Sequence, residues 1–143
     1  MECLFNKIFK KNNNIKNNGK VVLVVEDNEV DRSLIQKTLQ KEGYKVILAE
    51  NGAVGLKMAA ECKPNLVLLD CEMPVMDGQE MCRRIKEDDV LCNIPVLFLT
   101  GLNTPRNIVE CFDLDAENFL SKPVNPKILA SHIRTVLEDA QSK

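Results

Sequence analysis

Polar and ionisable side chains follow the ends of several short apolar runs in this 143-residue sequence. In chain order they are Glu26 with Asp27, then Asp70, then Thr100, and finally Ser121 with Lys122. In an open parallel α/β sheet the carboxyl ends of the strands share one edge, and ligands bind there at the point where the strand order reverses. We therefore expect these residues, far apart in sequence, to form one small site.

Three carboxylates in that set predict a divalent cation. If Glu26, Asp27 and Asp70 lie within a few ångströms of one another, they repel each other unless a cation binds or a pKa rises. Donors that are all oxygen, without histidine or thiolate, favour a hard cation. Because Mg²⁺ is held by one or two carboxylates together with waters and phosphate oxygens, the sequence predicts a magnesium site.

Lys122 and Thr100 complete the chemistry of a phosphoryl-transfer site. An ammonium and a hydroxyl directed at one point match the equatorial oxygens of a transferred phosphoryl group. A carboxylate can itself be the nucleophile and form an aspartyl phosphate. Asp70 is the best candidate for that role, because its strand is central in the expected sheet and is followed by a loop. Glu26 and Asp27 would then hold the metal.

The elements that must position these residues are short strands alternating with helices. Apolar runs predict strands, which we place at residues 21–25, 46–49, 66–69, 96–99 and 118–120. Helical patterns predict helices, which we place at about 29–42, 52–62, 78–87, 104–114 and 126–140. Five strands alternating with five helices predict a doubly wound α/β fold, in which helices cover both faces of a parallel sheet.

The composition favours one folded domain after a short extension. Residues 1–19 are rich in asparagine and lysine and predict a flexible extension, whereas residues 20–143 form the predicted domain. Within residues 4–11, apolar side chains at helical spacing lie beside lysines. That pattern is compatible with a basic amphipathic turn that touches a membrane or a partner, and also with a disordered extension.

Charge, cysteine spacing and hydropathy exclude several classes of protein. Residues 1–20 carry a net charge of +4, which leaves −6 for residues 21–143, and an acidic body argues against nucleic acid as a direct partner. No two of the six cysteines have C-x-x-C spacing, so zinc and thioredoxin-like motifs are not indicated. The absence of a transmembrane run and of a secretory signal predicts a cytoplasmic protein.

The sequence resembles the receiver domain of response regulators in two-component signal transduction, including the chemotaxis regulators. The resemblance rests on VVLVVEDNEVDRSLIQKTL, the turn at Asn51 and Gly52, KPNLVLLDCEMPVMDG, IPVLFLTG and NFLSKPVNP, which follow the family order across residues 20–140. The phrase from Asp70 to Gly78 is highly specific. The resemblance implies a flavodoxin-like (βα)5 fold with five parallel strands in the order 2-1-3-4-5.

The resemblance also implies a role for each site residue. It makes Asp70 the phosphoacceptor, Glu26 and Asp27 the acidic metal pair, and Thr100 and Lys122 the contacts of the phosphoryl group. It adds three features that come from the family alone: the backbone carbonyl of Glu72 binds the magnesium, Phe119 is the switch aromatic, and the Lys122–Pro123 peptide bond is cis.

The implied function is a phosphorylation-dependent switch. A sensor histidine kinase or a histidine phosphotransfer protein would supply the phosphoryl group, and a changed surface would bind a downstream protein target. The chain would act as a stand-alone receiver without an output domain, and it would be no enzyme beyond catalysing its own phosphorylation and dephosphorylation. A relay intermediate in a phosphorelay is an alternative within this class.

Two alternatives belong to other classes. The first is a magnesium-dependent phosphatase with an aspartate nucleophile, but phosphatases of the haloacid dehalogenase type carry an aspartate two residues after the nucleophile, where Glu72 stands here. The second is a flavodoxin-like electron carrier, since fold alone does not fix function. Its phosphate loop is rich in Ser, Thr and Gly, whereas the first strand here runs into Glu26, Asp27 and Asn28.

Overall fold

A parallel sheet forms the centre of the molecule. The computed structural model describes residues 18–70, 78–101 and 119–141. The five parallel strands have the order β2-β1-β3-β4-β5, which confirms the predicted flavodoxin-like topology. Their bounds are β1 (Val21–Val25), β2 (Lys45–Ala49), β3 (Leu66–Asp70), β4 (Val96–Thr100) and β5 (Phe119–Ser121). Asp70 and Thr100 are thus the last residues of their strands rather than the first residues beyond them.

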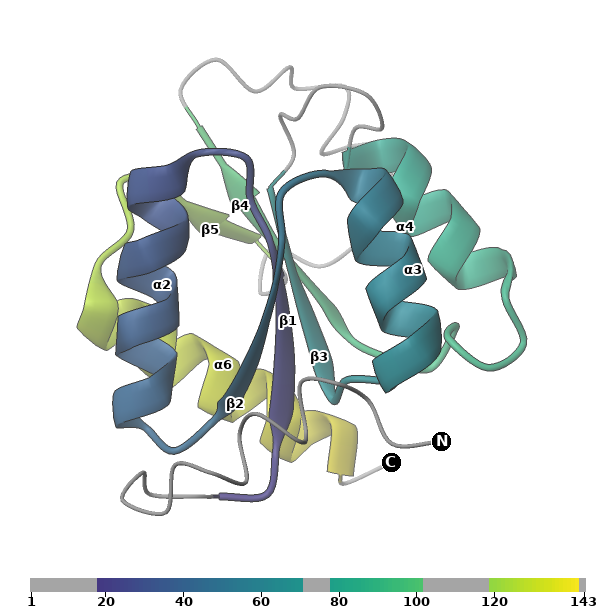
Figure 1. The fold of residues 1–143 in the computed structure, drawn as a ribbon. Coiled ribbons are helices and arrows are strands. Elements are labelled where there is room, and N and C mark those ends of the chain that lie inside the picture. The colour runs from purple at the N-terminus through teal and green to yellow at the C-terminus, as the bar shows by residue number, and fades with distance from the viewer. Residues whose placement is uncertain (1–17, 71–77, 102–118, 142–143) are drawn as a thin grey trace.

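Helices cover both faces of the sheet, as predicted. In the described part of the chain they are α2 (Glu29–Lys41), α3 (Gly52–Cys62), α4 (Gly78–Glu87) and α6 (Pro126–Gln141). Helices α2 and α6 pack on one face and α3 and α4 on the other (Figure 1). The predicted helix at 104–114 lies outside the described residues.

The central strand β1 is apolar throughout because both of its faces are buried. Along β1, Val22 and Val24 pack in the core beneath α2 and α6, whereas Leu23 and Val25 pack in the core beneath α3 and α4. All four side chains are fully buried. Side chains alternate between the faces of a strand, so a strand with helices on both sides reads as a continuous hydrophobic run.

Asparagine side chains cap the start of α2 and α3, and a glycine follows the end of α2. The side chain of Asn28 accepts a hydrogen bond from the backbone N–H of Asp31 and thereby caps α2. Asn51 caps α3 in the same way, so the predicted turn at this position is the start of a helix. Gly43, beyond the end of α2, has a φ of 91°, a left-handed conformation that glycine adopts without steric cost.

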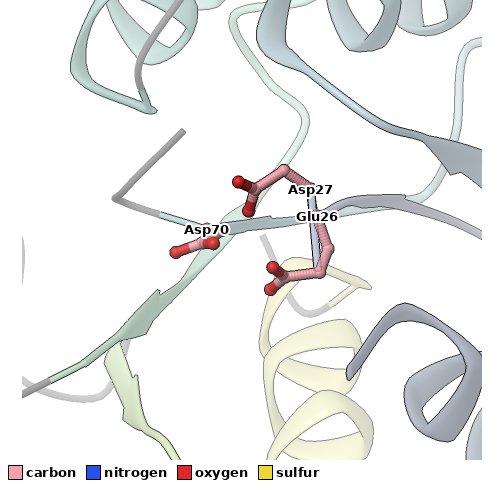
Figure 2. Close-up of side chains that lie close together, drawn as sticks. All are labelled: Glu26, Asp27 and Asp70. Carbon is pink, nitrogen blue, oxygen red and sulfur yellow. The ribbon is translucent and has the colours of Figure 1, made fainter. Parts of the chain in front are cut away.

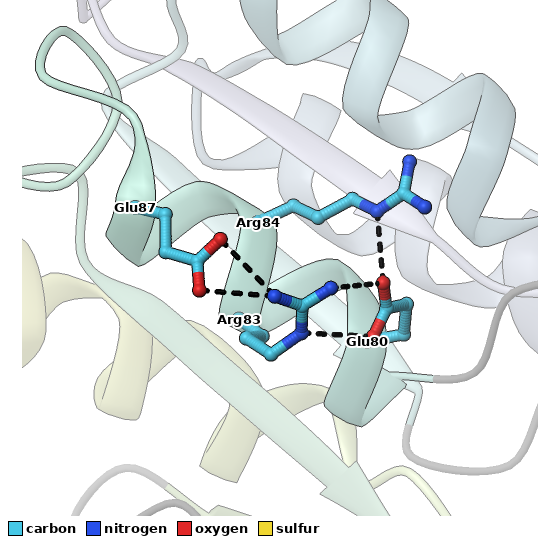
Figure 3. A network of polar contacts seen from close by, with 4 residues as sticks. All are labelled: Glu80, Arg83, Arg84 and Glu87. Atoms are coloured by element: carbon cyan, nitrogen blue, oxygen red, sulfur yellow. Dashed lines mark hydrogen bonds and ion pairs between the residues drawn. The ribbon is translucent and has the colours of Figure 1, made fainter.

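Ion pairs cover the exposed side of α4 (Figure 3). Arg83 pairs with Glu80 at 2.6 Å and with Glu87 at 2.9 Å, and Arg84 also pairs with Glu80, at 2.9 Å. Hydrogen bonds from the two arginines lower the pKa of Glu80 to about 2. The partners are three or four residues apart and therefore support the helix, but their exposure to water keeps the contribution small.

The described chain begins in contact with the domain. The backbone N–H of Asn18 donates to the carbonyl of Gly43 at 3.0 Å, and its side-chain amide donates to the carbonyl of Glu42 at 3.1 Å. The rest of the predicted flexible extension, residues 1–17, lies outside the described residues. The pattern of a basic amphipathic turn at residues 4–11 falls in the same segment. Among the helices that the structure describes, none combines the length and the apolar character needed to cross a bilayer.

Candidate functional site

The carboxyl ends of β1 and β3 bring three carboxylates together. Val25 pairs with Leu69 in the parallel ladder between these strands, so the next residue of each chain, Glu26 or Asp70, follows at the same level. Asp27 comes one residue later. One carboxylate oxygen from each of Glu26, Asp27 and Asp70 lies within 4.8 Å of the others (Figure 2). The predicted convergence of these side chains is thus present in the structure.

Glu26 is the most tightly held member of the cluster. Its backbone N–H donates to the carbonyl of Ala49 on β2 at 3.0 Å, and Arg32 on α2 donates from Nη1 to its carbonyl at 2.9 Å. Its Oε1 accepts a hydrogen bond from the backbone N–H of Asn28 at 3.0 Å. These bonds fix the turn between β1 and α2, and with it the position of Asp27.

Lys122, just beyond β5, places one ammonium group among the acidic side chains. Its Nζ lies 3.0 Å from Glu26 Oε2 and 3.1 Å from Asp70 Oδ2. A third oxygen, Asp31 Oδ2 on α2, lies 3.5 Å away. The side chains of Glu26 and Asp70 are almost completely buried, whereas that of Lys122 is 22% exposed. The ammonium group therefore lies between the carboxylate cluster and Asp31 of α2.

Burial and mutual repulsion shift the pKa values within this cluster. Burial, together with the neighbouring carboxylate of Asp70, raises the pKa of Glu26 to about 8. Burial opposes the charge of Lys122, but the carboxylates of Glu26 and Asp70 outweigh it and raise the pKa of the ammonium. Hence Lys122 stays charged at neutral pH, whereas the ionised form of Glu26 is disfavoured in the absence of a further cation.

The donor set fits a hard divalent cation. Within the described residues, Glu26 Oε2 is a buried polar atom without a hydrogen-bond partner, although it is ion-paired with Lys122. Asp27, by contrast, is exposed, so the cluster is open to solvent on one side. Three carboxylates with a single ammonium leave excess negative charge, and oxygen donors of this kind suit Mg²⁺.

A comparison with known protein families identifies the family of the chain. The family model of the response regulator receiver domain matches residues 22–134. This chain belongs to the response regulator receiver family. Receiver domains are signalling modules of two-component systems.

Curated relatives of this receiver domain agree with the match. The transcriptional regulatory protein AfsQ1 of Streptomyces coelicolor is 35% identical over 116 residues, which cover 81% of this chain and 50% of that protein. The polar-differentiation response regulator DivK of Brucella anthropi is 32% identical over 121 residues, which cover 85% of this chain and 98% of DivK. The chain thus spans about half the length of the first relatives that it matches.

A solved structure shows the same fold with a metal. The receiver domain of a sensor histidine kinase from Pseudomonas aeruginosa has a magnesium ion coordinated in its active-site cleft. It superimposes with a TM-score of 0.75 at 28% sequence identity, and the match covers 84% of this chain and 98% of that one.

The remaining predicted residues of this receiver domain are described only in part. The backbone of Thr100 ends β4 and pairs with Ser121, but its side chain is outside what the structure describes, and Glu72 lies outside the described residues. Phe119 stacks on Phe98 of the neighbouring strand with ring centroids 5.2 Å apart. The Lys122–Pro123 peptide bond is cis.

Sequence reasoning missed two residues that contact this cluster, Asp31 and Arg32. Both lie in the first turns of α2, and Asn28 caps that helix. The signal was present, because a capping asparagine directly after Glu26 and Asp27 fixes the start of a helix there. The side chains of its first turns are then close to the strand end.

Proposed function

We propose that this receiver domain is a phosphorylation-dependent switch that takes a phosphoryl group onto Asp70. One observation carries the proposal: a buried carboxylate at the end of a central strand has Lys122 Nζ 3.1 Å from one of its oxygens and two further carboxylates beside it. A structural ion pair needs one acid and one base. The additional acids leave negative charge that a divalent cation would balance.

The phosphoryl donor is a phosphohistidine of a sensor histidine kinase or of a histidine phosphotransfer protein. A carboxylate oxygen of Asp70 attacks the phosphorus, the new O–P bond forms, and the N–P bond to the imidazole breaks. The imidazole nitrogen keeps the electron pair and then takes a proton. The ammonium of Lys122 lies where it stabilises the charge on a phosphoryl oxygen, and Thr100 is proposed to donate its hydroxyl to another.

Glu26, Asp27 and Asp70 are the side chains that would hold Mg²⁺, with the backbone carbonyl of Glu72 as a further ligand implied by the family. Bound there, Mg²⁺ would neutralise the charge of the phosphoryl oxygens. The chemistry of the donor set supports this, as does the magnesium ion in the related receiver domain of Pseudomonas aeruginosa.

Phosphorylation would change the surface that the domain presents to a partner. We propose a protein target rather than nucleic acid, because residues 21–143 carry a net charge of −6. A relay intermediate, which would pass the phosphoryl group on to another histidine, uses the same site and remains the alternative.

Phosphorylation with a small-molecule donor tests the proposal. The purified chain is incubated with acetyl phosphate and Mg²⁺, and intact-mass spectrometry is expected to show one added phosphoryl group. The group should be released by hydroxylamine, as an acyl phosphate is. Asp70→Asn should abolish the labelling, because an amide is not a nucleophile of this kind.

A matched acidic control separates the nucleophile from its neighbours. Asp89→Asn removes an exposed carboxylate in the turn after α4 and should leave the labelling unchanged. Full labelling of Asp70→Asn, or labelling of the wild type on a residue other than Asp70, would contradict the proposal.

A further inference from the structure

Helix α2 contributes a carboxylate to Lys122 that the phosphoryl-transfer chemistry does not use. Asp31 Oδ2 lies 3.5 Å from Lys122 Nζ, and the two side chains are 30% and 22% exposed. The other two acidic partners of the lysine are nearer, at 3.0 and 3.1 Å, and nearly buried. The ion pair with Asp31 is therefore the longest of the three, and Asp31 is the most solvent-exposed of the three acidic partners.

The position of Asp31 follows from the start of the helix. Its backbone N–H donates to the side chain of Asn28 at 3.0 Å, which fixes the first turn of α2. A carboxylate in this turn is favoured by the positive end of the helix dipole. Glu29 is also an acidic residue in the first turn of α2. Within the part of the chain that the structure describes, however, no ion pair joins Glu29 to Lys122.

A phosphoryl group on Asp70 would compete with Asp31 for the same ammonium. Lys122 has three N–H donors and three carboxylates around it in the unphosphorylated arrangement. To donate to a phosphoryl oxygen, the ammonium must turn away from at least one carboxylate, and the partly exposed Asp31 is the one most easily given up. The negative charge of Asp31 also repels the incoming anion, so both effects act in one direction.

We propose that Asp31 is a positioning residue that holds Lys122 in the unphosphorylated arrangement and thereby weakens the affinity of the site for a phosphoryl group. The inference rests on the proposed function, because it concerns the competition of Asp31 and a phosphoryl group on Asp70 for the ammonium of Lys122. Removal of the Asp31 charge should shift the lysine towards the phosphoryl group.

The test measures the affinity for beryllofluoride, a mimic of the phosphoryl group, by amide chemical shifts at saturating Mg²⁺. Asp31→Asn keeps the backbone hydrogen bond to Asn28 and should bind beryllofluoride about twofold to fivefold more tightly than wild type, the range of a partly exposed ion pair. Asp31→Glu keeps a carboxylate on the same turn and should restore an affinity near that of wild type.

Glu29→Gln is the matched control, because it removes the same charge from the same helical turn. Glu29→Gln reports the long-range effect of the charge alone. Asp31→Asn should increase the affinity for beryllofluoride more than Glu29→Gln does, whereas the two variants should change the affinity for Mg²⁺ by the same factor. If Asp31→Asn binds beryllofluoride no more tightly than Glu29→Gln, or more weakly than wild type, Asp31 does not restrain Lys122. Failure of the wild type to bind beryllofluoride would instead count against the proposed function itself.

Discussion

At the scale of single residues, the two acids that end β1 have different environments. Glu26 is fully buried, is held by three hydrogen bonds and lies 3.0 Å from Lys122, whereas Asp27 is exposed. Burial penalises charge on Glu26 much more than on Asp27. The two acids therefore differ in their surroundings: Glu26 is held within the turn between β1 and α2, and Asp27 is open to solvent.

The raised pKa of Glu26 predicts that the metal-free domain loses stability as the pH rises. The pKa is about 8 in the folded state and 4.5 in the reference state, so between these values the folded state binds more protons than the unfolded one. The free energy of unfolding then falls with increasing pH, by at most about 1.4 kcal/mol per pH unit for this group. Lys122 adds no slope in this window, because its pKa is raised from a value already above 10.

Urea unfolding in the presence of a chelator, from pH 5 to pH 8.5, measures this slope. Glu26→Gln removes the titrating group and should flatten the decline. A wild type whose free energy of unfolding rises across this window would show that Glu26 is ionised throughout.

Asp27→Asn tests the repulsion among the carboxylates. Loss of this exposed charge should raise the free energy of unfolding of the metal-free domain by about 0.5–1 kcal/mol, because fewer like charges are brought together. The same change should weaken Mg²⁺ binding by about tenfold or more, since a direct ligand is lost. Calorimetric titration with Mg²⁺ and chemical unfolding measure the two effects, with Asp89→Asn as the control that should change neither.

At the scale of elements, the close approach of α3 to β1 supports the strand end that carries Glu26. Gly55 faces the sheet, and a Cβ atom built on it would lie 2.7 Å from Cγ2 of Val25 and 3.1 Å from Cε of Met81. Val25 is fully buried and is the residue directly before Glu26. A larger residue at position 55 would thus displace either the helix or the end of the strand.

Gly55→Ala should therefore destabilise the domain by about 1–3 kcal/mol, the usual cost of an added methyl group in a packed core. Helix propensity alone predicts the opposite, a gain of roughly 1 kcal/mol. The sign of the change in chemical unfolding decides between the two effects. A stabilised variant would mean that α3 can shift from β1 without cost.

At the scale of the whole molecule, the proposed function requires that phosphorylation of Asp70 alters a surface away from the site. The stacked rings of Phe98 and Phe119 join β4 and β5, whose ends carry Thr100 and Lys122. Hydrogen bonds to charged groups contribute roughly 1.5–3 kcal/mol each. Two or three that form only in the phosphorylated state would supply the approximately 5.5 kcal/mol that inverts a 1:99 equilibrium.

Thr100→Ala should accept the phosphoryl group on Asp70 but fail to transmit its presence. We expect Thr100 to couple the site to the surface, with its hydroxyl moving towards the phosphoryl group and Phe119 turning inward. Amide chemical shifts of β4 and β5 with and without beryllofluoride should change more in wild type than in the variant. Equal changes in the two proteins would show that Thr100 is not the coupling residue.

The sequence alone determined the alternation of strands and helices, the cluster of strand-end residues and the family. It did so because both faces of the central strands are buried, which makes these strands almost continuous apolar runs, and because parallel strands end at one edge. For this reason the sequence predicts that Glu26, Asp27, Asp70 and Lys122 converge, and the structure brings them together.

Only the tertiary structure decided how these groups share their charges. The sequence treats Glu26 and Asp27 as an equivalent pair, but the packing of α2 against the sheet buries the first and leaves the second exposed. The same packing directs Arg32 to the carbonyl of Glu26 and Asp31 to Lys122. Spacing along the chain does not fix the contact of Asp31 with Lys122, because it depends on the distance and orientation of α2 relative to the end of β5.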